Sequence, residues 1–104
     1  MNYHETASLL KIIADPSRLE ILDLLSCDEL CGYDLLEHFE FSQPTLSHHM
    51  KVLVNSNFVT KRKDGNKVMY ELNHEVMHNI ENQLQLINSA SEDCACQTMK
   101  KGVC

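Results

Sequence analysis

Five cysteines, at positions 27, 31, 94, 96 and 104, are the side chains best suited to chemistry in this 104-residue sequence. Their odd number, and a start without the basic and apolar segments of a secretion signal, favour reduced thiols over a disulfide framework. Thiolates bind soft metal and metalloid ions, so Cys94, Cys96 and Cys104 are interpreted as ligands in a segment without apolar periodicity. Cys31 is interpreted as the most reactive thiol because it opens a predicted helix, whereas Cys27 is predicted to be buried.

Two pairs of histidines offer a second possible metal chemistry. Neighbouring helical residues are about 100° apart, which puts His49 at the edge of an apolar stripe and turns His48 outward. We therefore do not expect these two side chains to share a metal or a catalytic task. His74 and His78 are four residues apart and share a helix face, which is a workable chelating pair. No histidine follows His78, and surface or capping roles are favoured for both.

Apolar periodicity predicts the helices that position these side chains, over residues 3–14, 15–26, 31–39, 42–54 and 74–89. Asp15 is suited to cap the second helix and Ser42 the fourth, and a proline follows each cap within two residues. Only residues 40–42 separate the third helix from the fourth, which is the spacing of a helix-turn-helix. The predicted apolar stripes contain Ala7, Leu10 and Ala14 in the first helix, Leu19, Leu22 and Leu25 in the second, Leu46, Met50 and Leu53 in the fourth, and Ile80, Leu84 and Ile87 in the last.

A charged β-hairpin is predicted from the segment FVTKRKDGNKVMYEL. Val68, Tyr70 and Leu72 recur at every second position, and Asp64-Gly65 marks the turn. The whole chain has a net charge of −6, yet residues 42–72 hold five basic and two acidic residues, a net +3. DNA responds to such a local surface within a Debye length of about 8–10 Å. The pattern predicts a mainly α fold with a small β-hairpin, a winged helix-turn-helix, and double-stranded operator DNA as partner.

Length and apolar content limit the class of protein. A chain of 104 residues is one small domain, and no apolar run approaches the roughly 18 residues of a membrane span, so a soluble cytoplasmic protein without a membrane partner is expected. The first and last helices carry more apolar surface than the short central motif needs, which predicts a homodimer through these helices. Such a dimer would present two recognition helices about 34–36 Å apart, matching successive major grooves. We expect residues 1–88 to form the DNA-binding and dimerisation domain and residues 89–104 a flexible tail.

Four strings together resemble the ArsR/SmtB family of dimeric winged-helix metalloregulatory repressors, and most closely its arsenical-resistance operon repressors. They are DPSRLEILDLL, ELC followed by DLL, SQPTLSHHMKVL and RKDGNKVMYEL, within residues 3–88. The resemblance implies that the protein is a repressor and not an enzyme. Such a repressor needs no cofactor to bind DNA, and it dissociates from DNA when As(III) or Sb(III) binds. It implies base-edge contacts from Gln43, Thr45, Ser47 and His48, phosphate contacts from Ser42 and Lys51, and wing contacts from Arg62, Lys63 and Lys67.

The sensing motif departs from the family pattern. Arsenical-responsive relatives have ELCxCD, whereas this chain has ELCGYDLL, so that Cys31 matches the first thiol, Tyr33 replaces the second and Leu36 occupies a possible third position. Because soft trivalent arsenic and antimony favour three sulfur ligands, this local site is incomplete. Oxidation, or another soft ion such as cadmium, lead or bismuth, is an alternative input, and a small metal-carrying thiol protein is an alternative of another class. The predicted ligands are Cys31, Cys94, Cys96 and Cys104.

Overall fold

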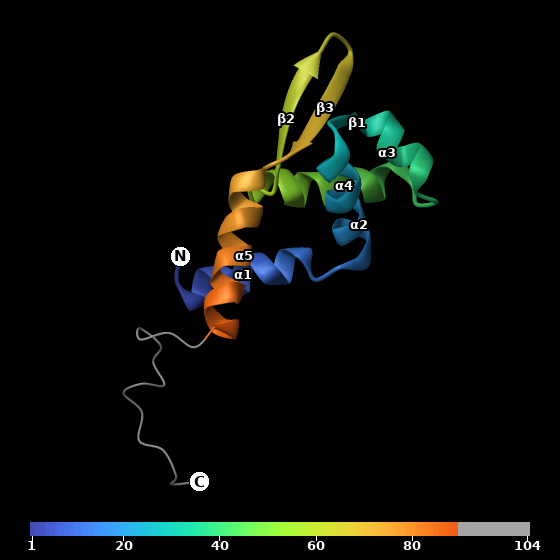
Figure 1. Cartoon of the computed structure of the whole chain (residues 1–104). Coiled ribbons are helices and arrows are strands. Elements are labelled where there is room, and N and C mark those ends of the chain that lie inside the picture. The colour runs from blue at the N-terminus through green and yellow to red at the C-terminus, as the bar shows by residue number, and fades with distance from the viewer. Residues whose placement is uncertain (90–104) are drawn as a thin grey trace, which may run out of the picture.

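The computed structural model describes residues 1–89, which form five helices and a three-stranded sheet (Figure 1). This confirms the predicted mainly helical fold with a small β-hairpin. The tail thiols Cys94, Cys96 and Cys104 lie outside the described residues, and the division at residue 88 stays a prediction. Along the chain the elements are α1 (Tyr3–Ile13), α2 (Pro16–Cys27), β1 (Leu30–Cys31), α3 (Gly32–His38), α4 (Gln43–Asn55), β2 (Val59–Asp64), β3 (Lys67–Leu72) and α5 (His74–Asn88).

The sheet is antiparallel and has the strand order β1-β3-β2. Its hairpin closes at the Asp64–Lys67 pair through Gly65 and Asn66, and Gly65 has a φ of 63°, as glycine has in the first loop position of a type II′ turn. Strand β1 was not expected from the sequence. It consists of two residues that pair with Tyr70 and Met69 of β3, and it thereby ties the connection between α2 and α3 to the hairpin.

One hydrophobic core joins α2, α3, α4, the sheet and α5. The apolar side of α4 is buried as expected, through Leu46, Met50 and Leu53. This burial fixes which side of α4 faces outward. The largest fully buried side chains are Phe58, Ile21, Leu25, Leu35, Leu53 and Val59.

Three of the predicted apolar stripes are corrected in part. In α1 the buried residue is Thr6, while Ala7 and Ala14 are exposed, because this helix packs through Leu9, Leu10 and its last isoleucines. In α2 the side chain of Leu19 is 51% exposed. In α5 Ile80 is buried, but Leu84 and Ile87 are 44% and 69% exposed. The exposed residues continue the apolar stripes of their helices onto surface that the rest of the described chain leaves uncovered.

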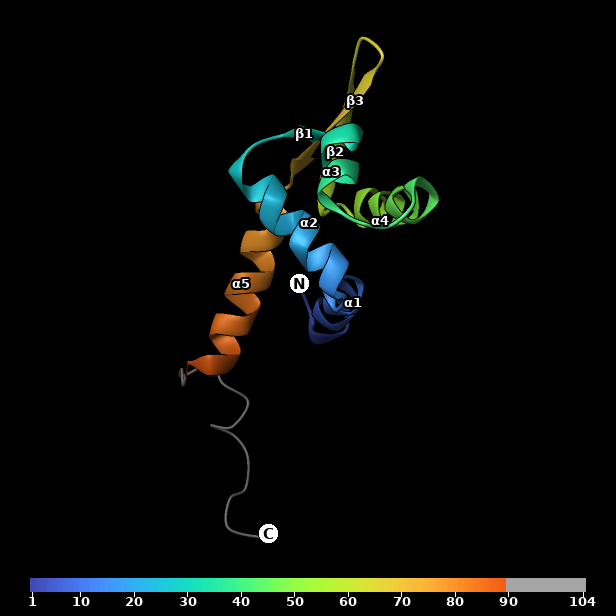
Figure 2. The ribbon, with the colours of Figure 1, turned by 90° about the vertical axis from the view of Figure 1, so that its right-hand side faces the viewer.

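The hairpin and the terminal helices lie at opposite ends of the described part. In Figures 1 and 2 the β2–β3 hairpin projects from one end, and α1 and α5 lie toward the other. Asn73 fixes the start of α5, because its side-chain amide donates a 2.9 Å hydrogen bond to the carbonyl of Asn57 and its backbone N–H donates to that of Phe58. Within residues 1–89, no helix has both the length and the apolarity that a bilayer crossing requires.

The N-cap of α2 gives a first testable expectation. Asp15 Oδ1 accepts a 3.0 Å hydrogen bond from the backbone N–H of Arg18, and this bond lowers the pKa of Asp15 below its ordinary value of 3.8. Asp15→Ala is expected to lower the free energy of unfolding by about 0.5–2 kcal/mol at neutral pH. Because the folded-state pKa is the lower one, the contribution is complete above the ordinary value and is lost as the pH falls through the folded value. Urea unfolding at one protein concentration and several pH values measures both effects.

The matched control is Asp15→Asn, which keeps a capping oxygen without its charge. It is expected to lose less stability than Asp15→Ala and to flatten the acid dependence. Equal losses for the two variants at every pH would contradict the capping argument.

Candidate nucleic-acid interface and sensing cleft

The outward side of α4 is a continuous polar surface. Its N-cap is Ser42, whose hydroxyl accepts the backbone N–H of Thr45 at 3.4 Å and lies 3.1 Å from the Thr45 hydroxyl. Every DNA-contact residue predicted on this helix or at its cap is exposed, while the opposite side is buried in the core. DNA contact by these side chains stays a prediction. They are Ser42, Gln43, Thr45, Ser47, His48 and Lys51.

The neighbouring histidines of α4 have separate surroundings, as the helical geometry predicts. His48 is exposed. His49 is half-buried, and its Nδ1 accepts a 3.1 Å hydrogen bond from Nε of Arg18 in α2. Arg18 also donates through Nη1 to the carbonyl of Ile12 at 3.0 Å. His49 therefore anchors α4 to α2 and α1 and leaves His48 as the histidine on the exposed side of α4.

Stacked aromatic rings fix the turn between α3 and α4. The rings of Phe39 and Phe41 stack with centroids 4.6 Å apart, and the ring of Phe41 lies 5.7 Å from that of His49. The turn of the helix-turn-helix is thus packed against the helix that it introduces. This aromatic cluster was not predicted from the sequence.

The hairpin carries the cations that accompany α4. Lys61, Lys63 and Lys67 are exposed. Sequence reasoning left Lys61 out of the contact set, yet it lines a groove of about 310 Å³ together with Ser47 and Lys51. The sequence does contain a signal for the position of Lys61. Side chains alternate along β2 with a period of two, which places Lys61 on the same side of the strand as buried Val59.

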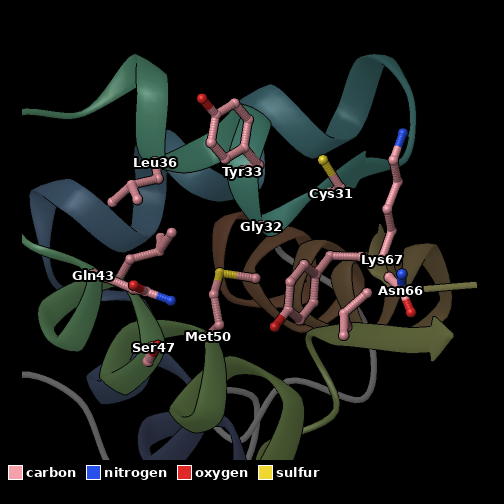
Figure 3. A pocket seen from close by; sticks show the side chains of 12 residues that line it. Cys31, Gly32, Tyr33, Leu36, Gln43, Ser47, Met50, Asn66 and Lys67 are labelled. Carbon is pink, nitrogen blue, oxygen red and sulfur yellow. The ribbon is translucent and has the colours of Figure 1, made fainter. Parts of the chain in front are cut away.

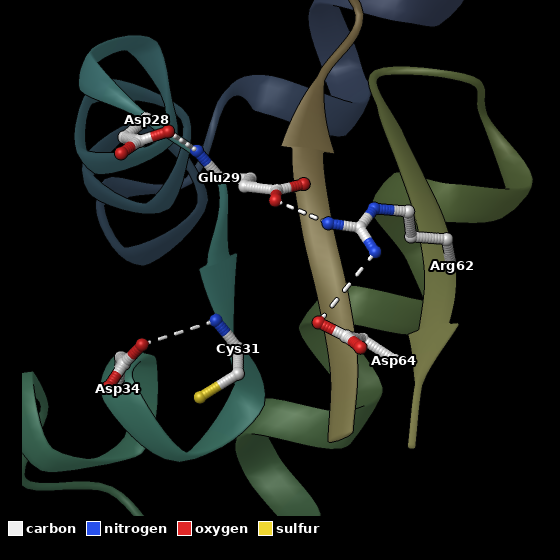
Figure 4. A network of polar contacts seen from close by, with 6 residues as sticks. All are labelled: Asp28, Glu29, Cys31, Asp34, Arg62 and Asp64. Carbon is white, nitrogen blue, oxygen red and sulfur yellow. Dashed lines mark hydrogen bonds and ion pairs between the residues drawn. The ribbon is translucent and has the colours of Figure 1, made fainter. Parts of the chain in front are cut away.

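Arg62, the fourth hairpin cation, has acidic partners within the protein (Figure 4). Its Nη2 hydrogen-bonds Glu29 Oε1, and its Nη1 lies 4.0 Å from Asp64 Oδ2. The hydrogen bond and the charge of Glu29 raise the pKa of Arg62 above its ordinary value. DNA contact by Arg62 stays a prediction, and in this conformation its guanidinium is occupied.

A cleft of about 410 Å³ lies between α3, α4 and the hairpin (Figure 3). Cys31, Tyr33 and Leu36, the three positions of the sensing motif that differs from the family pattern, all line this cleft. From α4 the lining includes Gln43 and Ser47, which were predicted to contact DNA. The candidate sensing position and the candidate DNA-reading helix therefore share one cavity.

Cys31 is buried and forms the N-cap of α3, and its backbone N–H donates a 3.3 Å hydrogen bond to Asp34 Oδ2. The other lining groups that could approach a soft ion are the thioether of Met50 and the phenols of Tyr33 and Tyr70, and burial raises the pKa of Tyr70. Within residues 1–89, no three His, Cys, Asp or Glu side chains are grouped to hold a metal ion. These residues alone do not fit a three-thiol centre, so such a centre needs thiols from beyond residue 89 or from a second copy.

The remaining candidate ligands are dispersed. The prediction that Cys27 is buried is wrong: it ends α2 about 200° around the helix from buried Leu25, and it is exposed. His78 is exposed, and its Nδ1 lies 3.4 Å from Glu81 Oε2. The surface or capping role of His74 and His78 stays a prediction.

Comparisons with known proteins identify a matching family, similar sequences and a similar solved structure. Residues 15–61 match the family described as "Bacterial regulatory protein, arsR family". The chain is 62% identical to the arsenical resistance operon repressor of Staphylococcus xylosus and 59% identical to that of Staphylococcus aureus, in each case over 100% of both chains. The solved structure of reduced HlyU from Vibrio cholerae N16961 has a TM-score of 0.67 and 36% identity, over 80% of this chain and 88% of that one.

Proposed function

The chain belongs to the arsR family of bacterial regulatory proteins, and from this membership we propose that it is a transcriptional repressor, released from operator DNA by a thiol-binding metalloid. The observation that carries the proposal is the exposed polar side of α4 beside the lysines of the hairpin. Relatives identical at 59–62% of positions are named as repressors, and no catalytic role is proposed for any residue.

DNA is bound through α4 and the hairpin together. Gln43, Thr45, Ser47 and His48 contact base edges in the major groove, where amide, hydroxyl and imidazole groups match donors and acceptors. Ser42 and Lys51 contact phosphates, which fix the register of the helix without reading sequence. Lys61, which lines a groove with Ser47 and Lys51, contacts a phosphate beside α4. Lys63 and Lys67, joined by Arg62 when it is released, contact the neighbouring backbone or minor groove.

The repressor acts as a homodimer through α1 and α5. Leu84 and Ile87 of α5 are 44% and 69% exposed and continue the stripe that begins at buried Ile80. Packing the same stripe of a second copy against them removes this apolar surface from water. The two α4 helices are then related by a two-fold axis, as a palindromic operator requires.

Sensing acts through the cleft that α3 shares with α4. The proposed inducer is arsenite or antimonite, bound by Cys31 together with thiols among Cys94, Cys96 and Cys104. A ligand at Cys31 occupies the cavity lined by Gln43 and Ser47, and so favours positions of α4 that fit DNA less well. By reciprocity, operator DNA weakens inducer binding by the same factor.

Arsenite is expected to lower the affinity of the wild-type protein for DNA about 5–150-fold, the range of a typical allosteric coupling. Cys31→Ser is expected to abolish this release, and a chain truncated after Ser89 is expected to weaken or abolish it. The matched control is Cys27→Ser, which removes an exposed thiol outside the cleft and leaves release unchanged. Gel shift with a duplex selected by the wild-type chain from a random-sequence library measures all four proteins.

Failure of arsenite to release the wild type would overturn the inducer and leave the repressor in place. Repeating the titration with antimonite, cadmium, lead, bismuth and peroxide then identifies the input. X-ray absorption on the arsenite-loaded protein, with and without Cys31, counts the sulfur ligands directly.

A further inference from the structure

Arg62 lies near two carboxylates on the hairpin that is proposed to bind DNA. Glu29 accepts a hydrogen bond from Nη2, and Asp64 lies 4.0 Å from Nη1 on the other side of the guanidinium (Figure 4). The side chain of Glu29 is 29% exposed and that of Arg62 is 54% exposed. The pair is thus close enough to solvent for an incoming phosphate to reach it.

Glu29 is held in place by the backbone around it. Its N–H donates a 2.8 Å hydrogen bond to the carboxylate of Asp28, and the next two residues form β1, which pairs with β3. In the sheet, Cys31 is paired with Met69, and Met69 is paired with Arg62. The carboxylate of Glu29 therefore reaches Arg62 across β3 from the residue immediately before β1, whose position the strand pairing fixes.

Glu29 has no place in the DNA-binding or sensing sets described above. We propose that Glu29 is a positioning residue that competes with DNA phosphate for Arg62. In free protein the guanidinium stays on Glu29, and DNA binding at the hairpin requires its transfer to a phosphate. This inference rests on the proposed function only in taking DNA as the ligand of the hairpin. The competing carboxylate lies two residues before Cys31 in the same segment. A shift of β1 would therefore change how available Arg62 is to DNA phosphate.

Removal of the competing carboxylate is therefore expected to strengthen DNA binding. An exposed ion pair of ordinary strength, broken once in each subunit, corresponds to a gain of about 2- to 30-fold in affinity for Glu29→Gln. In the Arg62→Gln background the same change is expected to give only the general gain that follows from one fewer negative charge, because no guanidinium is left to release. Within the Glu29→Gln background, adding Arg62→Gln is expected to flatten the salt slope by about 1.8 per dimer, or about 0.9 for each lost phosphate contact.

Glu71→Gln is the matched control. Glu71 is an exposed carboxylate of β3 that contributes to the field at Arg62 without forming an ion pair with it among residues 1–89. Fluorescence anisotropy with the selected duplex, at several salt concentrations, measures the affinities of all variants as full-length chains. A gain with Glu29→Gln that exceeds the gain with Glu71→Gln, and that falls to the level of Glu71→Gln in the Arg62→Gln background, supports the competition.

Equal gains for the two glutamate variants would reduce the effect to general charge and overturn the proposal. A loss of affinity with Glu29→Gln in a protein that unfolds at the wild-type temperature would also overturn it, since Glu29 would then be presenting Arg62 to DNA. The ¹⁵N NMR signal of the Arg62 guanidinium, which is expected to shift on addition of DNA, tests the transfer in unaltered protein. If the wild type itself fails to bind the duplex, the proposed function fails instead.

Discussion

The affinity of the dimer for DNA is expected to fall about 10³–10⁵-fold between 50 and 200 mM salt, as for proteins that neutralise 6–10 phosphates. The structure gives the physical reason. Within residues 1–89, Lys51, Lys61, Lys63 and Lys67 form no ion pair, which gives four cations per subunit and eight per dimer. Each cation that meets a phosphate releases condensed counterions, so log K is expected to fall with log salt at a slope of about −5 to −7, and of about −9 when Arg62 of both subunits also meets a phosphate.

Single substitutions assign this slope to residues. Lys61→Gln and Lys63→Gln are each expected to flatten the slope by about 1.8 per dimer, since each removes two contacts. Lys11→Gln is the matched control, because Lys11 is an exposed lysine of α1, at the end of the described part away from the hairpin. A flat salt response of the wild type, or equal effects of Lys11→Gln and Lys61→Gln, would contradict binding through the hairpin face. Anisotropy titrations at constant pH measure the slopes.

Local signals in the sequence predicted the elements that position the site. Asp15 and Ser42 cap α2 and α4 as expected, and Gly65 adopts a positive φ in the hairpin loop, although it occupies the first loop position and not the second, where the Asp-Gly signal places it. Each of these depends on residues a few positions apart, which a single sequence displays. The separate roles of His48 and His49 also followed from helical geometry alone.

Features that depend on distant residues were not predictable in this way. Strand β1 has two residues, too few for a periodic pattern, and it exists because β3 offers it a partner. Glu29 and Arg62 are separated by 33 positions, and nothing in either local string indicates the other. Cys27 was expected to be buried because free cysteines usually are, but its exposure depends on where α2 ends.

The position of the sensing cleft was only partly predictable from the sequence. Helical spacing alone does not group Cys31, Tyr33 and Leu36 with α4; it was the family motif that marked these three positions. The structure adds that they share a cavity with Gln43 and Ser47, which gives the proposed coupling a physical route. The motif located the site, and the packing of α3 on α4 indicates how a ligand there would act on DNA binding.

The double substitution Leu84→Glu/Ile87→Glu is expected to dissociate the dimer and to lower the affinity for DNA toward its non-specific level, a loss of about 10³-fold or more. Burying a leucine or isoleucine side chain contributes about 1.5–3 kcal/mol, and a two-fold interface contains each of them twice. Because the two side chains are already partly buried, at 44% and 69% exposure, the four in a dimer correspond to about 3–7 kcal/mol, up to about half of the association energy of a nanomolar dimer. Sedimentation analysis measures the mass, and gel shift measures DNA binding.

The fold of each subunit is expected to survive this change, because both side chains are already exposed in the single chain, at 44% and 69%. Asn82→Glu is the matched control: it adds a carboxylate to the same helix, about 160° around it from buried Ile80, and is expected to leave a dimer that binds DNA. A double variant that keeps the wild-type helical content in circular dichroism yet sediments as a monomer supports an interface through α5. If it remains dimeric and binds DNA with wild-type affinity, then the subunits associate through another surface, and the exposed stripe of α5 needs a different partner.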